Sequence, residues 1–365
     1  MLLAYTNATI YTGTSIETNK AVLVDDRTII DIVPAGAIPS NYETVDLQGH
    51  QLAPAFIDLQ IYGGNGKLFS EELSIASLQA TYDYCVAGGC THFMITMATN
   101  TIEKFLKGME VVKAYWEQGG KGLLGLHLEG PYMNPVKRGA HLANCVKAAT
   151  VEEVRLLLEK GRGIFKMMTL APEVNPTAVV DLLLAQNIIV SAGHSNATYT
   201  QATTAFDSGI PAATHLYNAM SPFQHREPGM VGAIFNHPTV QASIVCDGIH
   251  VNYTAVKIAK QVMGERLFYI TDAVAETLTG EYKHVFNTDH YDLPDGTLSG
   301  SALTMMQCVK NGVLHAGIPL DESLRMASYY PARFIKDQKL GLIAPGYEAD
   351  LVVFDEKLEV VRTIG

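Results

Sequence analysis

Short apolar runs rich in β-forming residues recur along the middle of this chain, each separated from the next by enough residues for a helix. The strand-like runs cover residues 56–62, 92–97, 123–128, 164–170, 188–192, 212–216, 242–246 and 267–271. Stretches between them, such as "TVEEVRLLLEKG", place apolar residues at helical spacing. Strands that alternate with helices build parallel sheets. Eight such strands predict an α/β fold of the (β/α)₈ TIM-type barrel class, with a doubly wound open sheet as the alternative.

The two ends of the chain have a different pattern. Residues 1–50 contain "LLAYTNATIYTG", "AVLVDD" and "TIIDIVP", and residues 340–356 read "LGLIAPGYEADLVVFDE". These are short β-type runs joined by polar turns, without helical periodicity. We therefore expect residues 1–51 and 341–365 to pair into one small β-sandwich domain, and residues 52–340 to form the barrel.

Composition narrows the class of protein. The chain has 365 residues and a net charge of 26 − 37 = −11, which argues against a nucleic-acid partner. No run approaches the ~20 apolar residues of a membrane helix, and "MLLAYTNATIYTG" lacks the pattern of a signal peptide. The five cysteines form no CxxC pair, as in reduced intracellular proteins. We expect a cytoplasmic protein that binds neither nucleic acid nor membrane.

Polar residues follow the predicted strands at their carboxyl ends, where barrel enzymes place their catalytic groups. One carboxylate and two imidazoles from separate strand ends suit a catalytic zinc site, which keeps a position open for water. A further unpaired acid at the same end could move a proton. Any one of these histidines alone is more often structural, but the whole set favours chemistry. The set comprises Gln60, Tyr62, His127, Glu129, His141, His194, His215, Asn218, Asp247, His250 and Asp272.

Two further segments carry open alternatives. Arg226 in "HREPGMVGAIF" suits either a phosphate or carboxylate ligand or a surface ion pair with Glu227. The segment 275–305, "AETLTGEYKHVFNTDHYDLPDGTLSGSALTM", is too long for an ordinary loop of a barrel. It either closes over the site or is a tolerated surface insertion.

Taken together, the motifs resemble those of one known family. "HLEGPY…KRGAH", "GHSNATY", "THLYNAM", "DGIH", "ITDA", "LSGSALTM" and the terminal "GLIAPGYEADLVVFD" occur in the order found in the N-acetylglucosamine-6-phosphate deacetylases of the amidohydrolase superfamily. The resemblance covers residues 5–356 and implies hydrolysis of the acetamide of N-acetylglucosamine-6-phosphate to glucosamine-6-phosphate and acetate. It implies a metal-activated water, a role in amino-sugar catabolism or recycling, and a homodimer.

The same resemblance assigns roles to individual residues. It implies Glu129, His194 and His215 as metal ligands, Asp272 as the catalytic acid and base, and His141 beside the acetyl carbonyl. It places Arg226 and His250 near the 6-phosphate. The positions that it matches to substrate contacts are Ala140, His141, Asn218, Ala219, Arg226, Asp247, His250, Leu298, Ser299 and Gly300.

One position departs from the superfamily pattern. Most amidohydrolases carry His-x-His at the end of the first barrel strand, whereas this chain has Gln60 and Tyr62. An amide and a phenol are poor substitutes for imidazole as metal ligands. We therefore expect one divalent metal ion per subunit, zinc first, with iron, cobalt or manganese as alternatives. Gln60 and Tyr62 then belong to the pocket as hydrogen-bonding and wall residues.

Two other functions compete with this one. The chain could be an amidohydrolase acting on another N-acyl sugar or on a cyclic amide, which the "THLYNAM" motif and Arg226 disfavour. It could also be an inactive sugar-phosphate sensor, which would have to lack a metal ligand or the acid. None of Glu129, His194, His215 and Asp272 is missing.

Overall fold

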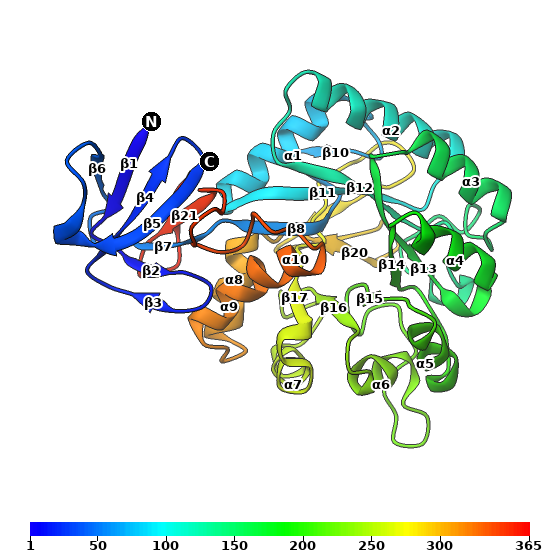
Figure 1. Ribbon diagram of the computed structural model, residues 1–365. Coiled ribbons are helices and arrows are strands. Elements are labelled where there is room, and N and C mark those ends of the chain that lie inside the picture. Colours follow the sequence, from blue (N-terminus) through cyan, green and yellow to red (C-terminus); the bar gives the residue numbers. More distant parts are fainter. The chain divides into compact units, whose positions relative to one another are not determined.

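The computed structural model describes residues 1–365 (Figure 1). The chain divides into two compact units. The first comprises residues 1–58, 84–92 and 304–365, and the second comprises residues 59–83 and 93–303. The proposed site residues all belong to the second unit.

The second unit is built on a parallel eight-stranded sheet. Its strand order is β17-β16-β15-β14-β13-β12-β11-β8, so neighbours in sequence are neighbours in space. Hydrogen bonds from the Tyr62 amide to the Ala273 carbonyl (2.9 Å) and from the Asp272 amide to the Gln60 carbonyl (2.9 Å) join the two outer edges. This closure confirms the barrel and excludes the open sheet. The strands are β8 (Phe56–Ile61), β11 (Cys90–Ala98), β12 (Leu123–Glu129), β13 (Phe165–Leu170), β14 (Ile189–Ala192), β15 (Ala212–Ala213), β16 (Gln241–Ile244) and β17 (Leu267–Tyr269).

Helices follow the strands in turn, which confirms the alternating pattern. Thr101, Thr150, Thr198 and Asn252 each accept a backbone N–H at the start of a helix, as expected of N-cap residues. The helices are α1 (Ile75–Ala87), α2 (Ile102–Glu117), α3 (Val151–Lys160), α4 (Thr177–Ala185), α5 (Tyr199–Asp207), α6 (Gly229–Asn236) and α7 (Tyr253–Met263).

The long segment after β17 folds into a small antiparallel sheet. Its strands are β18 (Val285–Asn287), β19 (His290–Asp292) and β20 (Leu298–Ser301), in the order β18-β19-β20. A second short pair, β9 (Gly63–Gly64) and β10 (Lys67–Leu68), follows the first barrel strand. The two additions extend the carboxyl ends of the barrel strands that flank the closure.

The first unit contains two sheets formed by both ends of the chain. One has the order β5-β4-β1-β6 and the other β22-β21-β7-β2-β3. Buried side chains such as Ile10, Val22, Leu52 and Val353 form a common core, which confirms the small terminal β-sandwich. The strands are β1 (Leu2–Thr6), β2 (Thr9–Tyr11), β3 (Ile16–Glu17), β4 (Lys20–Asp25), β5 (Thr28–Pro34), β6 (Glu43–Asp46), β7 (Gln51–Pro54), β21 (Leu351–Phe354) and β22 (Val360–Ile364).

The remaining helices, α8 (Met305–Leu314), α9 (Leu320–Ala327) and α10 (Tyr329–Phe334), also belong to the first unit. All five cysteines are free thiols. No helix combines the length and the apolar character needed to cross a bilayer.

Candidate active site

A cavity opens at the carboxyl ends of the barrel strands and gathers most of the predicted site residues. Among those predicted, the cavity is lined by Tyr62, Glu129, Ala140, His141, His194, His215, Asn218, Ala219, His250, Asp272, Leu298, Ser299 and Gly300. Residues predicted at separate strand ends therefore line one common cavity. Gln60 lies behind the lining as a buried side chain, and Arg226 and Asp247 are not part of it.

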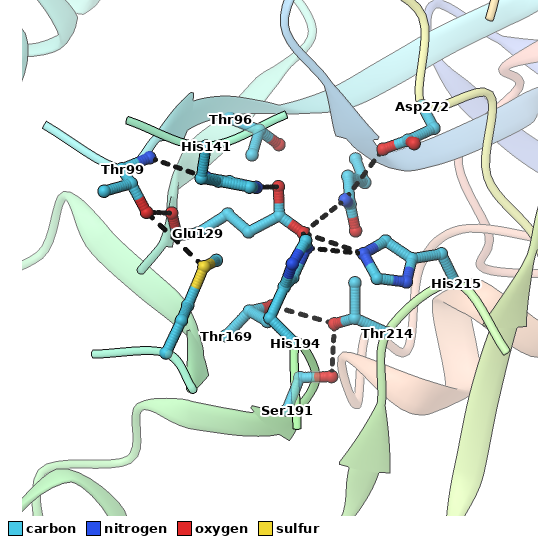
Figure 2. A network of polar contacts seen from close by, with 12 residues as sticks. Thr96, Thr99, Glu129, His141, Thr169, Ser191, His194, Thr214, His215 and Asp272 are labelled. Atoms are coloured by element: carbon cyan, nitrogen blue, oxygen red, sulfur yellow. Dashed lines mark hydrogen bonds and ion pairs between the residues drawn. The ribbon is translucent and has the colours of Figure 1, made fainter. Parts of the chain in front are cut away.

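Glu129, at the end of β12, is the centre of the polar network (Figure 2). Its Oε1 lies 3.1 Å from His215 Nε2 and 3.3 Å from His194 Nε2. The same two imidazole nitrogens are 3.0 Å apart. The other carboxylate oxygen, Oε2, lies 3.3 Å from His141 Nε2. Three histidines and one carboxylate thus meet in a buried cluster.

Hydrogen bonds at the far side of each ring distinguish the histidines. His194 Nδ1 lies 2.9 Å from the carbonyl of Lys137, so Nδ1 carries the proton and leaves the Nε2 lone pair free. His141 Nδ1 instead accepts the backbone N–H of Thr99 at 3.1 Å, so in the neutral ring Nε2 carries the proton. His194 is therefore prepared as a metal ligand, whereas His141 is prepared as a hydrogen-bond donor.

The cluster fits a divalent ion by the chemistry of its donors. A buried carboxylate and imidazole nitrogens at 3.0–3.3 Å from one another are the ligand types of catalytic zinc. His215 Nδ1 is buried without a hydrogen-bond partner, so the contacts of this ring are all made through Nε2. Glu129, His141 and His194 also lie close enough together to hold a metal ion. Because His141 Nε2 carries the proton, His215 is the better third ligand.

Gln60 and Tyr62 occupy the end of the first barrel strand, and both donate to this cluster. The Gln60 amide donates to Glu129 Oε1 (3.1 Å) and to Asp272 Oδ1 (2.8 Å). The Tyr62 hydroxyl donates to Glu129 Oε2. Tyr62 also forms part of the cavity wall. Gln60 and Tyr62 therefore place hydrogen-bond donors at the end of the first barrel strand. N–H and O–H groups favour contact with carboxylates and not with a second cation.

Burial and hydrogen bonding set the charges of the cluster. Burial alone would raise the pKa of Glu129, but the adjacent imidazoles of His141, His194 and His215 outweigh it and hold that pKa well below its usual value. Burial lowers the pKa of His194 to about 4. Burial beside Glu129 raises the pKa of Tyr62 well above its usual value, so its hydroxyl remains a donor. Glu129 is thus ionised and His194 neutral near pH 7, as metal ligands must be.

Asp272 follows β17 and faces the cluster across the cavity (Figure 2). Burial raises the pKa of its carboxyl group above the usual value. Asp272, His194 and His215 all have positive φ angles, of 55°, 48° and 37°. Such backbone costs roughly 1–3 kcal/mol per residue and is concentrated at functional sites. The strained backbone at three strand ends turns these side chains into the cavity.

Close packing also fixes the direction of His194. The preceding residue is Gly193, and a Cβ atom there would lie 2.7 Å from Thr169 Cγ2. Only glycine allows that approach between the ends of β13 and β14. Beneath the site, hydroxyls of Thr169, Thr214 and Ser191 bond in series at 2.8 and 2.6 Å. His127 joins this layer through Thr169 (2.8 Å), so it is a structural histidine.

His250 lines the cavity, and Asp247 supports it from behind. His250 Nδ1 lies 2.5 Å from Asp247 Oδ2, while Asp247 Oδ1 accepts the backbone N–H groups of Ile249 (2.9 Å) and His250 (2.8 Å). Burial opposes ionisation of Asp247, but the contact with His250 prevails and lowers the pKa of the carboxyl group. The Asp247 carboxylate therefore orients the His250 ring toward the cavity.

Arg226 is exposed in the loop before α6 and has no ion pair or hydrogen bond. The alternative partner, Glu227, accepts instead from the amides of Tyr199 (2.7 Å) and Gly229 (3.1 Å). The surface ion pair between these two neighbours is thus not formed. The Arg226 guanidinium remains available for an anion from outside this chain.

Sequence reasoning missed several cavity residues, chiefly on the segment after β17. Tyr282 donates to the Thr99 carbonyl (2.6 Å) and His284 Nδ1 lies 2.8 Å from Ser299 Oγ. Their only sequence signal was the length of their loop. The Ser70 hydroxyl, also in the lining, has no hydrogen-bond partner. Apolar lining comes from Leu68, Ala98 and Val274.

Comparison with known proteins identifies the class to which this fold and site belong. Residues 52–364 match the amidohydrolase family, and residues 2–52 match the NagA composite domain. The chain belongs to the amidohydrolase family. The match spans the barrel, its metal-type cluster and the terminal strands.

Particular relatives are more specific. The chain is 37% identical over 378 residues to the N-acetylglucosamine-6-phosphate deacetylase of Haemophilus influenzae, covering 100% of this chain and 98% of that protein. It is similar to the crystal structure of the deacetylase of the same name from Pasteurella multocida, with a TM-score of 0.96 and 37% identity over 100% and 98% of the two chains. The resemblance inferred from the motifs is confirmed.

Two other relatives have a phosphorylated N-acetyl sugar in their description. The structure is similar to that of a Mycobacterium smegmatis deacetylase variant in complex with N-acetyl-D-glucosamine-6-phosphate, with a TM-score of 0.89 and 29% identity over 100% and 97% of the two chains. The sequence is also 32% identical to the N-acetylgalactosamine-6-phosphate deacetylase of a Shewanella strain, over 85% of this chain and 80% of that protein.

Proposed function

We propose that this protein hydrolyses the acetamide of N-acetylglucosamine-6-phosphate to glucosamine-6-phosphate and acetate. The observation that carries the proposal is the arrangement of Glu129, His194 and His215 in one buried cluster, with Asp272 across the same cavity. Relatives that carry this activity in their names match the chain over nearly its whole length. An inactive sensor is disfavoured because the ligand cluster and the acid are both in place.

Glu129, His194 and His215 would hold one divalent ion. When bound, such an ion lowers the pKa of a coordinated water and polarises the amide carbonyl. Gln60 and Tyr62 support the limit of one ion, because both direct N–H or O–H groups at Glu129. Zinc is the first choice for this donor set, and iron, cobalt or manganese would also be accepted.

Asp272 would accept the proton of the attacking water and then donate it to the sugar nitrogen as the C–N bond breaks. The Gln60 amide holds Asp272 Oδ1 at 2.8 Å, which fixes the orientation of this carboxylate in the cavity wall. The pKa of Asp272, raised by burial, suits a group that must accept and return a proton.

His141 would stabilise the charge that develops on the carbonyl oxygen. Its Nε2 carries the proton because Nδ1 accepts from the Thr99 backbone, and this N–H lies in the cavity lining, 3.3 Å from Glu129 Oε2. A donor fixed in advance costs no reorganisation in the transition state. The apolar lining of Leu68, Ala98 and Val274 would receive the methyl group of the acetyl.

The 6-phosphate would lie toward His250 and Arg226, with the sugar along Asn218, Ala219 and the segment Leu298–Gly300. The Asn218 side-chain nitrogen is buried without a partner, so a ligand oxygen would satisfy it. Arg226 is exposed in the loop before α6. Its unpaired guanidinium supports the expected homodimer, in which the pocket is completed at the subunit boundary. The free cysteines support a cytoplasmic location.

N-Acetylgalactosamine-6-phosphate is a second candidate substrate. The specific observation in its favour is the 32% identity to a deacetylase named for that sugar. The two sugars differ only in the configuration of one hydroxyl group. The metal-type cluster would act on the acetamide of both sugars in the same way. The cavity wall would therefore have to discriminate between the two sugars.

The decisive experiment is a deacetylation assay on both phosphorylated sugars and on free N-acetylglucosamine, with metal content measured on the same sample. We expect turnover of N-acetylglucosamine-6-phosphate above the other two, and about one tightly held ion per chain after dialysis. Absence of acetate release with the ion present would refute the proposed activity. Two ions that both depend on Glu129 would refute the single-metal site.

A further inference from the structure

A second group of metal-type side chains lies in the terminal unit, apart from the catalytic cluster. It consists of His92 on β11 and of Glu348 and Asp350 just before β21, and their ligand-type atoms all lie within 4.8 Å of one another. His92 is the only residue of β11 that is not fully buried. The proposed deacetylation uses none of the three.

The backbone holds the carboxylates of this group in a fixed frame. The Ala349 amide donates to the Arg27 carbonyl (2.8 Å), and the Ile29 amide donates to the Tyr347 carbonyl (2.9 Å). The Asp350 carbonyl in turn accepts the amide of Ala55 (2.9 Å). The segment 347–350 is therefore pinned on both sides, so its carboxylates cannot move far apart.

Asp350 supplies the observation that points to a ligand. Its side chain is only 6% exposed, yet its Oδ2 has no hydrogen-bond partner. A buried carboxylate oxygen without a partner is costly. This oxygen faces His92, whose Nδ1 lies 3.9 Å away. The distance is too long for a hydrogen bond and close to the ~3.4 Å that separates two ligands of one tetrahedral zinc ion.

The positively charged side chain nearest to this group, that of Arg27, makes only distant contacts with it. Arg27 Nη2 lies 3.5 Å from Asp350 Oδ1 and 3.8 Å from Glu348 Oε2, and its side chain is 63% exposed. These distances are long for a guanidinium, because hydrogen bonds between arginine and carboxylates are generally about 2.7–2.9 Å. His92 Nδ1 also lies 3.1 Å from the Thr91 hydroxyl. The hydroxyl can give up this contact, which would leave Nδ1 available to an ion.

We propose that His92, Glu348 and Asp350 form a second divalent-cation site, of the zinc or manganese class, in the terminal unit. Imidazole is a borderline ligand and carboxylates are hard ligands, and such ions accept both kinds. Glu348 is 41% exposed, which gives the ion access from solvent and makes this site weaker than the buried catalytic cluster. The ion would join β11 to the strand β21 and stabilise the terminal unit.

The test is a calorimetric titration of chelator-treated full-length protein with Zn²⁺, repeated with Mn²⁺. The Glu129→Gln variant removes a ligand of the catalytic cluster only, so an ion that it still binds reports the second site. We expect two binding events in the unaltered protein and one in Glu129→Gln. In His92→Ala the weaker event should be lost or weakened at least about tenfold, and the catalytic event should stay. His315→Ala, which removes an exposed histidine, is the matched control and should keep both.

Thermal melting gives an independent readout that does not depend on activity. Added Zn²⁺ should raise the Tm of Glu129→Gln, but not that of the variant carrying both Glu129→Gln and His92→Ala. If His92→Ala folds poorly, Asp350→Asn provides the same comparison with little change in shape. A single binding event in the unaltered protein, or a weaker event that survives both His92→Ala and Asp350→Asn, would show an ion-pair cluster only and overturn the proposal.

Discussion

Two parts of the cavity are built on different principles. The floor consists of Glu129, His194, His215 and Asp272, each at or just after the end of a barrel strand. The hairpin wall consists of Tyr282, His284 and Ser299, all from the segment between β17 and α8. The floor is held by backbone geometry and by contacts of 3.0–3.3 Å around one carboxylate. The wall is held by side-chain hydrogen bonds such as that of Tyr282 to Thr99.

The difference shows how chemistry and selectivity are divided in this fold. Eight parallel strands bring their carboxyl ends together wherever the barrel closes, so the floor is rigid and its charges are fixed by burial. The hairpin wall is an insertion, which can change in sequence without disturbing the barrel. We therefore expect changes in the floor to abolish the reaction and changes in the wall to alter stability or substrate preference.

The largest effect is expected for His194→Asn. Loss of the Nε2 lone pair removes a ligand from the cluster, so metal affinity should fall by at least about a hundredfold and deacetylation should fall to background. Metal analysis after dialysis and an acetate-release assay measure both. His127→Gln, at a buried histidine of the layer beneath the site, is the matched control and should keep the ion. Retention of a full ion in His194→Asn would remove this residue from the ligand set.

Asp272→Asn separates proton transfer from metal binding within the floor. An amide cannot accept the proton, so kcat should fall by about 10²–10⁴-fold, while metal content and Tm stay close to those of the unaltered protein. Steady-state kinetics on the phosphorylated sugar, with metal analysis on the same sample, measures the change. A near-normal kcat would exclude Asp272 as the acid and base.

Arg226→Ala tests whether a residue outside both parts contributes to substrate binding. A lost charged hydrogen bond to phosphate is worth about 1.5–3 kcal/mol, so kcat/KM should fall by roughly 10–100-fold for the phosphorylated sugar. Free N-acetylglucosamine should be affected little, because it lacks the phosphate. Glu227→Gln, next in sequence, is the control. Equal losses on both sugars would reassign Arg226 to a structural role.

The smallest effect on turnover is expected in the hairpin wall, where the prediction concerns the dependence of stability on pH. Burial lowers the pKa of His284 to about 4, against about 6.5 in the unfolded chain. Between these values the unfolded state binds more protons, so the free energy of unfolding falls as pH falls from about 6.5 to about 4. Over that pH range, His284 lowers the free energy of unfolding by about 3 kcal/mol in total.

His284→Leu should remove that part of the acid sensitivity. Ser299 can still donate to the Tyr291 carbonyl at 3.1 Å, so the substitution leaves no new unpaired group. Urea unfolding at pH values between 4.5 and 7.5, compared with the unaltered protein, measures the difference. Parallel curves for the two proteins would mean that His284 is not buried in its neutral form. Metal content should be unchanged, since the wall lies outside the floor.

The fold and the floor were predictable from sequence because both depend on periodicity. The eight apolar runs correspond to the eight barrel strands, and residues just past those runs converge at one end of the barrel. Gln60 and Tyr62 were recognised by position, but their shared contact with Glu129 was not. Gln60 and Tyr62 are separated from Glu129 by 69 and 67 positions in the chain. No local pattern encodes such a contact. Tyr282, His284 and Ser70 were missed for the same reason.

The sequence by itself determined the alternating barrel, the β-rich terminal unit, the family resemblance and the residue types at the strand ends, because these follow from local spacing and from motifs. Only the tertiary structure decided which nitrogen each histidine offers. The Lys137 carbonyl frees Nε2 of His194, and the Thr99 amide places the proton on Nε2 of His141. Tertiary packing alone also brings His92 to Asp350, across 258 residues of chain, since 350 − 92 = 258. Hydrogen-bond partners from distant segments are fixed by packing, and packing exists only once the chain has folded.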